Sequence, residues 1–308
     1  MPRLPRILIK GPEVAYHVIS RTALDGFVLG PVEKDYLLSL IRWLSQVFFV
    51  EVYGFCIMGN HFHLLCRMLP PDHFSDDEVR ARVDLYYAKV AKTEKDLEQT
   101  CNLPYWRSRL ADLSRYVQEI KQRFSRWYNK LHGRKGYFWG DRFKSVVIEK
   151  GEALLSCLAY IELNPIRAGI VERPEDYRWC SLAYHLGVEN DGFLSTDFGL
   201  GSFSQDSYYE RLRIYRRFVY EKGGLEVSGQ ACISSRILQK ERAKDFQISP
   251  REIYRRRIRY FTEGLILGSR EFVQRVSWQL RELLGLRRKR LPHKLSFQNS
   301  LYSFRRLG

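Results

Sequence analysis

A long apolar stretch that runs into a tight turn constrains the fold of this chain more than any other feature. Residues 47–58 (VFFVEVYGFCIM) are apolar, β-branched or aromatic almost throughout, with Glu51 as the one charged interruption. Such a run is typical of a strand that is covered on both faces. Gly59 and Asn60 supply a turn signal, and residues 61–68 are expected to return as an antiparallel partner. A buried hairpin is therefore predicted.

The segments around this hairpin predict an α+β fold. Short β-branched and aromatic runs favour further strands at residues 15–20 and 143–149. Helical spacing of apolar residues favours helices at 32–44, 110–131 and 152–163, and a charged helix is expected at 76–98. The helix at 152–163 should end near Asn164, because Pro165 disfavours helical geometry in the residue before it. Together these elements predict an antiparallel sheet with helices packed on it.

The net charge of +16 over 308 residues indicates an anionic partner. From Arg251 to the end, fifteen Lys and Arg stand against four Glu, so this segment carries +11 of the +16. Residues 187–206 are rich in Gly, Ser and Asp. We therefore expect a first domain at 1–186, a linker at 187–206 and a small, basic, mainly helical domain at 207–308. Arg255, Arg256 and Arg259 are its candidate DNA contacts; a solvated surface is the alternative.

Several classes of protein are disfavoured. The run at 47–58 is shorter than the roughly 18–20 residues that a membrane-spanning helix needs. No secretory signal is found, so we expect a cytoplasmic, nucleoid-associated protein whose six cysteines are reduced. The sequence has no GxxxxGK[ST] motif, which argues against a nucleotide cofactor.

His61-Phe62-His63 is the most informative short motif. Residues i and i+2 of a strand project from the same face, so both imidazoles would point one way. Two neutral imidazoles on one strand can bind a divalent metal and leave coordination positions open. The alternative is that the His-x-His sequence occurs by chance and does not form a metal site. A closed zinc site with Cys56 and Cys66 is disfavoured, because Cys66 lies an odd number of residues from both histidines.

Tyr160 and Asn164 form the second candidate pair. They lie four residues apart and share one helix face if the last turn holds. The amide oxygen of Asn164 could then serve as a third metal ligand beside a phenol. As one of 19 tyrosines, Tyr160 by itself would more often be a core residue.

Five short motifs, which include these residues, follow one another along the chain in a fixed order. They are Tyr16-His17-Val18 with Arg21, residues 58–65 (MGNHFHLL), residues 136–139 (GYFW) with Arg142-Phe143-Lys144, residues 160–169 (YIELNPIRAG), and residues 177–181 (YRWCS). In this combination the sequence resembles the single-tyrosine HUH transposases, specifically the REP-associated tyrosine transposase branch of the insertion-sequence-200-like family. The resemblance covers about residues 1–186, except for an acidic-leaning insertion at about 70–110. That insertion could shape a DNA groove, act as a lid or decorate the surface.

The resemblance implies a ferredoxin-like antiparallel sheet with packed helices, and roles for residues already singled out. His61, His63 and Asn164 would hold a catalytic Mg²⁺ or Mn²⁺, and Tyr160 would be the nucleophile. The implied activity is cleavage and strand transfer of single-stranded DNA beside hairpins through a 5′-phosphotyrosine, by a protein that could form a homodimer. A metal activates the scissile phosphate for in-line attack, and exchanging one phosphate ester for another needs no nucleoside triphosphate.

Basic residues near these motifs are candidate DNA contacts. His17, Arg21, Arg142 and Lys144 could bind phosphates or unpaired bases, or belong to an ordinary solvated surface. Two other functions stay open. One is a non-catalytic regulator that binds hairpin DNA or RNA, and the other is a metal nuclease in which water attacks the phosphate.

Overall fold

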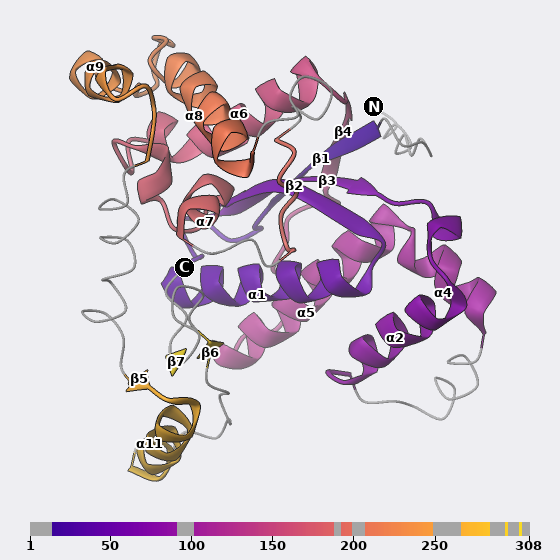
Figure 1. Cartoon of the computed structure of the whole chain (residues 1–308). Coiled ribbons are helices and arrows are strands. Elements are labelled where there is room, and N and C mark those ends of the chain that lie inside the picture. The colour runs from indigo at the N-terminus through magenta and orange to yellow at the C-terminus, as the bar shows by residue number, and fades with distance from the viewer. Residues whose placement is uncertain are drawn as a thin grey trace.

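A four-stranded antiparallel sheet lies at the centre of the fold (Figure 1). Its strands are β1 (Val14–Arg21), β2 (Val50–Ile57), β3 (His61–Met68) and β4 (Lys144–Glu149), in the order β2-β3-β1-β4. With the helices α1 (Pro31–Val47) and α5 (Leu113–Leu131), the chain follows the β-α-β-β-α-β path of ferredoxin-like folds. The computed structural model describes residues 14–90, 102–187, 192–198, 207–248, 266–283, 293–294 and 302–303. The expected α+β class and the hairpin of β2 and β3 are confirmed.

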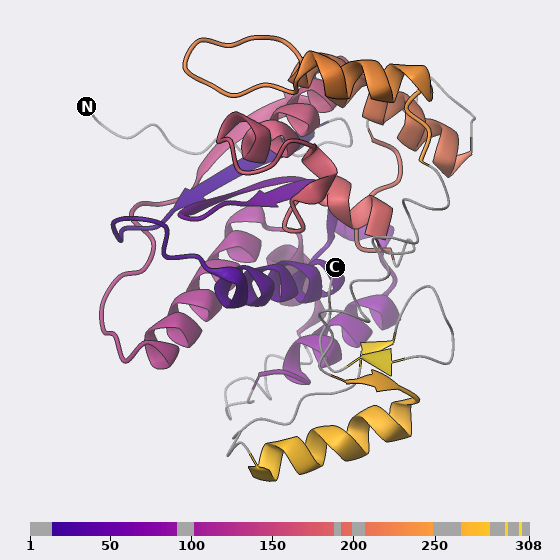
Figure 2. The same cartoon turned by 90° about the vertical axis from the view of Figure 1, so that its left-hand side faces the viewer.

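Helices α1 and α5 cover one face of the sheet (Figures 1 and 2). The apolar stripe of α5 packs against side chains from β1 and β3, and Val117, Ile120 and Phe124 are fully buried there. Helix α5 begins at Leu113, three residues later than expected, because the Asp112 carboxylate accepts hydrogen bonds from the N–H groups of Ser114 and Arg115. A separate helix, α4 (Leu103–Leu110), precedes it.

The insertion expected at about 70–110 packs into the same core. It contains the 3-10 turn η1 (Pro71–His73), helix α2 (Asp76–Tyr87) and helix α4. Helix α2 opens with a reciprocal cap between Ser75 and Glu78 and buries Val79 and Val83. The helix expected at 76–98 corresponds to α2, which begins at Asp76 and ends at Tyr87. Residues 91–101 lie outside the described residues.

Helix α6 (Glu152–Arg167) covers the opposite face of the sheet, and it does not end at Asn164 as expected. Pro165 lies inside the helix, and its missing N–H leaves the carbonyl of Ile161 without its helical donor. The Asn164 side-chain amide takes that place and donates to Ile161 O at 3.2 Å. The helix continues to Arg167 and is closed by Gly169 (φ +67°), in a Schellman arrangement in which Ile170 N–H donates to Pro165 O.

The chain after α6 extends the core around that helix. It forms the 3-10 turn η2 (Pro174–Asp176) and the helices α7 (Ser181–Gly187), α8 (Tyr208–Gly223) and α9 (Ser235–Ala243). Tyr215, Val219 and Tyr220 of α8 are fully buried in the cluster that also contains Leu158 of α6. Within the expected linker, the described residues 192–198 pack against β2, where Ser195 N–H donates to Val52 O at 2.8 Å. The division into domains stays a prediction.

The last described elements are small. They are β5 (Leu267–Gly268), α11 (Arg270–Leu283), β6 (His293–Lys294) and β7 (Tyr302–Ser303), and the three strands form a second sheet in the order β5-β7-β6. The predicted contacts Arg255, Arg256 and Arg259 lie outside the described residues. None of the helices within the described ranges has both the length and the apolarity to cross a membrane.

Candidate active site

Strands β1 and β3 bring three histidines to the sheet face that α6 covers. Arg21 of β1 pairs with His61 of β3, and Ile19 pairs with His63, so alternate residues of the two strands share this face. The ring centroids of His61 and His63 are 5.0 Å apart, and those of His17 and His63 are 5.1 Å apart. The predicted common orientation of His61 and His63 is therefore present, and β1 adds His17 beside them.

Hydrogen bonds fix the orientation of the rings. His61 Nδ1 lies 2.7 Å from Asn60 Oδ1. An amide oxygen only accepts, so His61 Nδ1 carries the proton and Nε2 keeps its lone pair. His63 Nδ1 lies 2.9 Å from His17 Nε2. A neutral His63 that donates through Nδ1 would likewise have its Nε2 lone pair free, and His17 would then be the acceptor.

The electrostatic surroundings keep these imidazoles neutral. Burial lowers the pKa of His17 to about 4 and, with smaller contributions from the neighbouring histidines, the pKa of His63 to about 3. The pKa of His61 is also lowered, first by burial and then by the positive charge of Arg21. Only the neutral form of an imidazole can bind a metal. At neutral pH the three rings are therefore in the form that a metal ligand requires.

Tyr160 lies above the histidines on α6. Its ring centroid is 6.0 Å from His17 and 6.0 Å from His63, and its side chain is 56% exposed. Its neighbours Leu158 and Ala159 are buried against the sheet and hold the helix in place. A core role for Tyr160 is thus wrong: the phenol faces solvent at the edge of the histidine cluster.

Asn164 lies one helical turn after Tyr160. Its side-chain nitrogen donates to the carbonyls of Tyr160 at 2.9 Å and Ile161 at 3.2 Å. Both hydrogen bonds use the amide nitrogen, so the amide oxygen stays available as an acceptor. Two neutral imidazoles and an amide oxygen are a donor set that a divalent metal can accept, so these residues fit the implied ion. Across the described ranges, no group of three or more His, Cys, Asp or Glu side chains is arranged to hold a metal.

The cysteines near the histidine pair do not complete a zinc site. Cys66 lies in the core on the α1 and α5 side of the sheet, whereas Leu65, which shares a face with His63, lies in the core on the α6 side. Burial also raises the pKa of the Cys66 thiol to about 12. The prediction that Cys66 points away from the histidines is confirmed.

The other candidate DNA contacts differ in exposure. Arg21, Arg142 and Lys144 are exposed near the end of β1 and the start of β4. His17 is only 5% exposed and is bonded to His63, so a phosphate contact by its ring stays a prediction. The His-x-His motif does not predict that His17 joins the cluster, because the position of His17 beside His63 depends on the pairing of two strands that are far apart in sequence.

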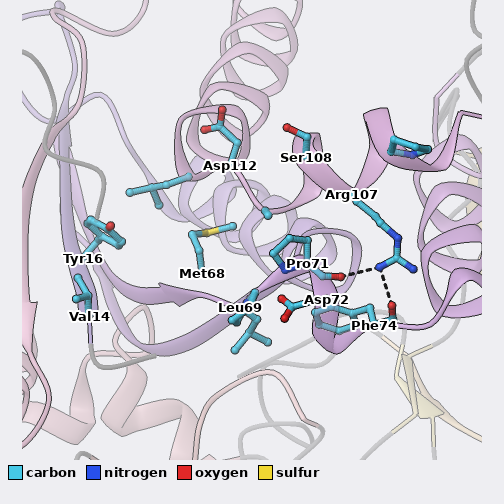
Figure 3. Close-up of a pocket in the computed structure, with 14 residues that line it drawn as sticks. Val14, Tyr16, Met68, Leu69, Pro71, Asp72, Phe74, Arg107, Ser108 and Asp112 are labelled. Atoms are coloured by element: carbon cyan, nitrogen blue, oxygen red, sulfur yellow. Dashed lines mark hydrogen bonds between the residues drawn. The ribbon is translucent and has the colours of Figure 1, made fainter. Parts of the chain in front are cut away.

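A cavity of about 1020 Å³ lies at the other end of the same strands (Figure 3). Val14 and Tyr16 at the start of β1 and Met68 at the end of β3 line one side, and the insertion lines the other. There the Arg107 guanidinium donates to the carbonyls of Pro71 and Phe74 at 2.6 and 2.7 Å. This cavity contains none of the predicted site residues.

Comparison with solved structures finds only distant similarity. No protein family matches the sequence, and no curated protein is similar to it. Among solved structures, a REP-associated tyrosine transposase bound to a REP hairpin aligns with 76% of this chain and 100% of the other, at 15% sequence identity and a TM-score of 0.42. A similarity this distant does not assign a function.

Proposed function

We propose that this protein is a metal-dependent DNA strand transferase that uses Tyr160 as its nucleophile. The observation that carries the proposal is the cluster itself: a solvent-facing phenol 6.0 Å from two stacked, neutral histidines, one of which belongs to a His-x-His pair. A phenol has an ordinary pKa near 10 and needs an activated phosphate to react at neutral pH.

His61, His63 and Asn164 would hold the metal, as the sequence resemblance implies. Bound there, Mg²⁺ or Mn²⁺ would withdraw charge from the oxygens of the scissile phosphate. Asn60 would keep His61 Nδ1 protonated, and His17 would do the same for His63 Nδ1, so that both Nε2 atoms keep their lone pairs for the metal. The helical turn between Tyr160 and Asn164 keeps the phenol and the amide oxygen on one face of α6.

The proposed step forms one bond and breaks one. The Tyr160 oxygen attacks the phosphorus and the bond from phosphorus to the 3′ oxygen breaks. The phenol gives its proton to solvent, and the leaving 3′ oxygen takes one up from solvent. The products are a 5′-phosphotyrosine and a free 3′-hydroxyl. Attack by another 3′-hydroxyl reverses the step and joins two strands. A hairpin-forming single strand is the proposed substrate, and the basic residues Arg21, Arg142 and Lys144 are proposed to contact its backbone.

The test is a denaturing gel after incubation of the full chain with a labelled single-stranded hairpin and Mg²⁺ or Mn²⁺. A covalent adduct is expected, and Tyr160→Phe should abolish it. Tyr209→Phe on α8 is the matched control, because Tyr209 is also exposed but lies outside the cluster. An adduct that survives Tyr160→Phe would refute the nucleophile.

The same gel separates the two other functions. Cleavage that tolerates Tyr160→Phe but is lost in His61→Ala would identify a metal nuclease that uses water. Salt-sensitive binding of the hairpin without an adduct in either metal would identify a non-catalytic regulator.

A further inference from the structure

A second hollow lies between helix α5 and the loop that leads into β4. It has a volume of about 830 Å³ and is open to solvent along the polar face of α5. Lys121, Arg126 and Asn129 line it from the helix, and Tyr137, Asp141 and Arg142 line it from the loop. We call this hollow the α5 groove. None of the residues assigned to the metal or to the nucleophile lies in it.

Tyr137 is an exposed aromatic ring on an anchored backbone. Its side chain is 90% exposed, whereas the next two residues of the loop, Phe138 and Trp139, are buried. Asn129 Nδ2 donates to Gly136 O at 2.8 Å, and Ala23 N–H donates to Phe138 O at 2.8 Å. The backbone is thus fixed on both sides of Tyr137. An apolar ring held in water in this way is suited to stack on a flat partner such as a nucleobase.

Positive charge predominates along the groove. Lys121, Arg126 and Arg142 are its cationic residues, and Asp141 is its one acidic residue. Lys121 Nζ donates to the backbone carbonyl of Asp141 at 2.7 Å, which ties the helix to the loop. Arg126 and Arg142 are exposed on either side. A polyanion would therefore be attracted to the groove, and a single strand offers free base faces to the exposed ring, whereas the bases of a duplex are already stacked on one another.

The backbone at the end of β1 links the groove to the candidate active site. Gly140 N–H donates to Arg21 O at 3.0 Å, and Trp139 pairs with Thr22. Arg21 in turn lies opposite His61 in the sheet. The end of β1 therefore borders both the histidine cluster and the groove, so one strand of nucleic acid could contact both.

We propose that the α5 groove binds unpaired nucleotides of the DNA substrate, with a base stacked on Tyr137 and phosphates on Arg126 and Arg142. This inference rests on the proposed function for the identity of the ligand as DNA. It concerns binding alone, so it can fail or hold independently of the covalent step.

The test measures the Kd of the full chain for fluorescein-labelled DNA hairpins by anisotropy, with Tyr160→Phe as the background so that no cleavage occurs. One hairpin carries a single-stranded flank, and the other is the same hairpin without it. Tyr137→Ala should weaken binding of the flanked hairpin by about 5- to 150-fold, which is the loss of one stacked base. Binding of the hairpin without a flank should change by less than about 2-fold.

The charges give a second readout. The double variant Arg126→Gln/Arg142→Gln should lower the slope of log Kd against log salt by about 0.7 for each phosphate that the variant no longer neutralises. The matched controls are Tyr209→Ala, which removes a ring that is 72% exposed on α8, and Arg80→Gln on α2. Both controls should bind the flanked hairpin like the parent.

Three results would overturn the proposal. The first is an unchanged Kd for the flanked hairpin in Tyr137→Ala and in the arginine variant. The second is an equal loss for both hairpins, which would make the groove a duplex site. The third is tighter binding of an RNA flank of the same sequence. If the chain with Tyr160 intact forms no adduct in the gel assay while these Kd differences are observed, the proposed function is refuted and the groove stays in place.

Discussion

Substitution of Gly54 by alanine tests how α6, with Tyr160 and Asn164, is seated on the sheet. Gly54 lies in β2 beside a bulge where the pairing with β3 shifts. A Cβ atom there would lie 2.2 Å from Leu158 Cδ1 and 2.8 Å from Ser181 Oγ. The first distance is far inside van der Waals contact, and Leu158 is fully buried. Either the Leu158 side chain or the whole helix must move.

The expected cost follows from these contacts. Overpacking of a buried site costs about 1–3 kcal/mol. Displacing the Ser181 hydroxyl would also disturb its hydrogen bonds with the N–H of Phe55 and with the carboxyl group of Glu162. The better strand propensity of alanine offsets roughly 0.5–1 kcal/mol. We therefore expect Gly54→Ala to lower the free energy of unfolding by about 1–3 kcal/mol.

Urea denaturation at constant m-value measures this loss. Gly140→Ala is the matched control, because its Cβ would meet Thr22 O at 3.5 Å, an ordinary contact. Leu158→Ala should cost about 2–5 kcal/mol alone but less in the Gly54→Ala background, where the new methyl group fills part of the space. Unchanged stability of Gly54→Ala, or strict additivity in the double variant, would refute the close approach of α6 to β2.

Three further predictions concern His185, Asn164 and His17. His185 is only 8% exposed, and burial lowers its pKa from 6.5 to about 3. The unfolded chain therefore takes up a proton that the folded chain does not, and the free energy of unfolding should fall as pH drops below 6.5, by about 2 kcal/mol at pH 5. Urea unfolding curves of His185→Phe should show a correspondingly smaller fall in this free energy between pH 7 and 5 than those of the unsubstituted protein. Asn164→Ala should cost about 1 kcal/mol in thermal or urea unfolding, and much less in a Pro165→Ala background that restores the backbone donor; equal costs in both would contradict the capping role. His17→Phe should weaken Mn²⁺ binding about 10- to 100-fold in a calorimetric titration, and unchanged affinity would show that the bond to His63 does not orient a ligand.

The pattern of the sequence predicts the central hairpin and the period-2 placement of His61 and His63 correctly, because both depend on neighbours in the chain. The same holds for the amphipathic stripe of α5. The expectation that the helix ends before a proline fails at Pro165. A side chain one residue earlier supplies the donor that proline lacks, and Gly169 ends the helix a turn later.

The amino-acid sequence by itself determines which side chains can do chemistry here: two histidines with one orientation, a tyrosine and an asparagine a helical turn apart, and an excess of positive charge. Only the tertiary structure decides that His17 joins the histidine pair, since this depends on the register of β1 against β3, 46 residues apart. The docking of α6 through Gly54 and Leu158 likewise brings Tyr160 over the rings. Spacing along the chain fixes which residues share a face, whereas packing between distant segments fixes which faces meet.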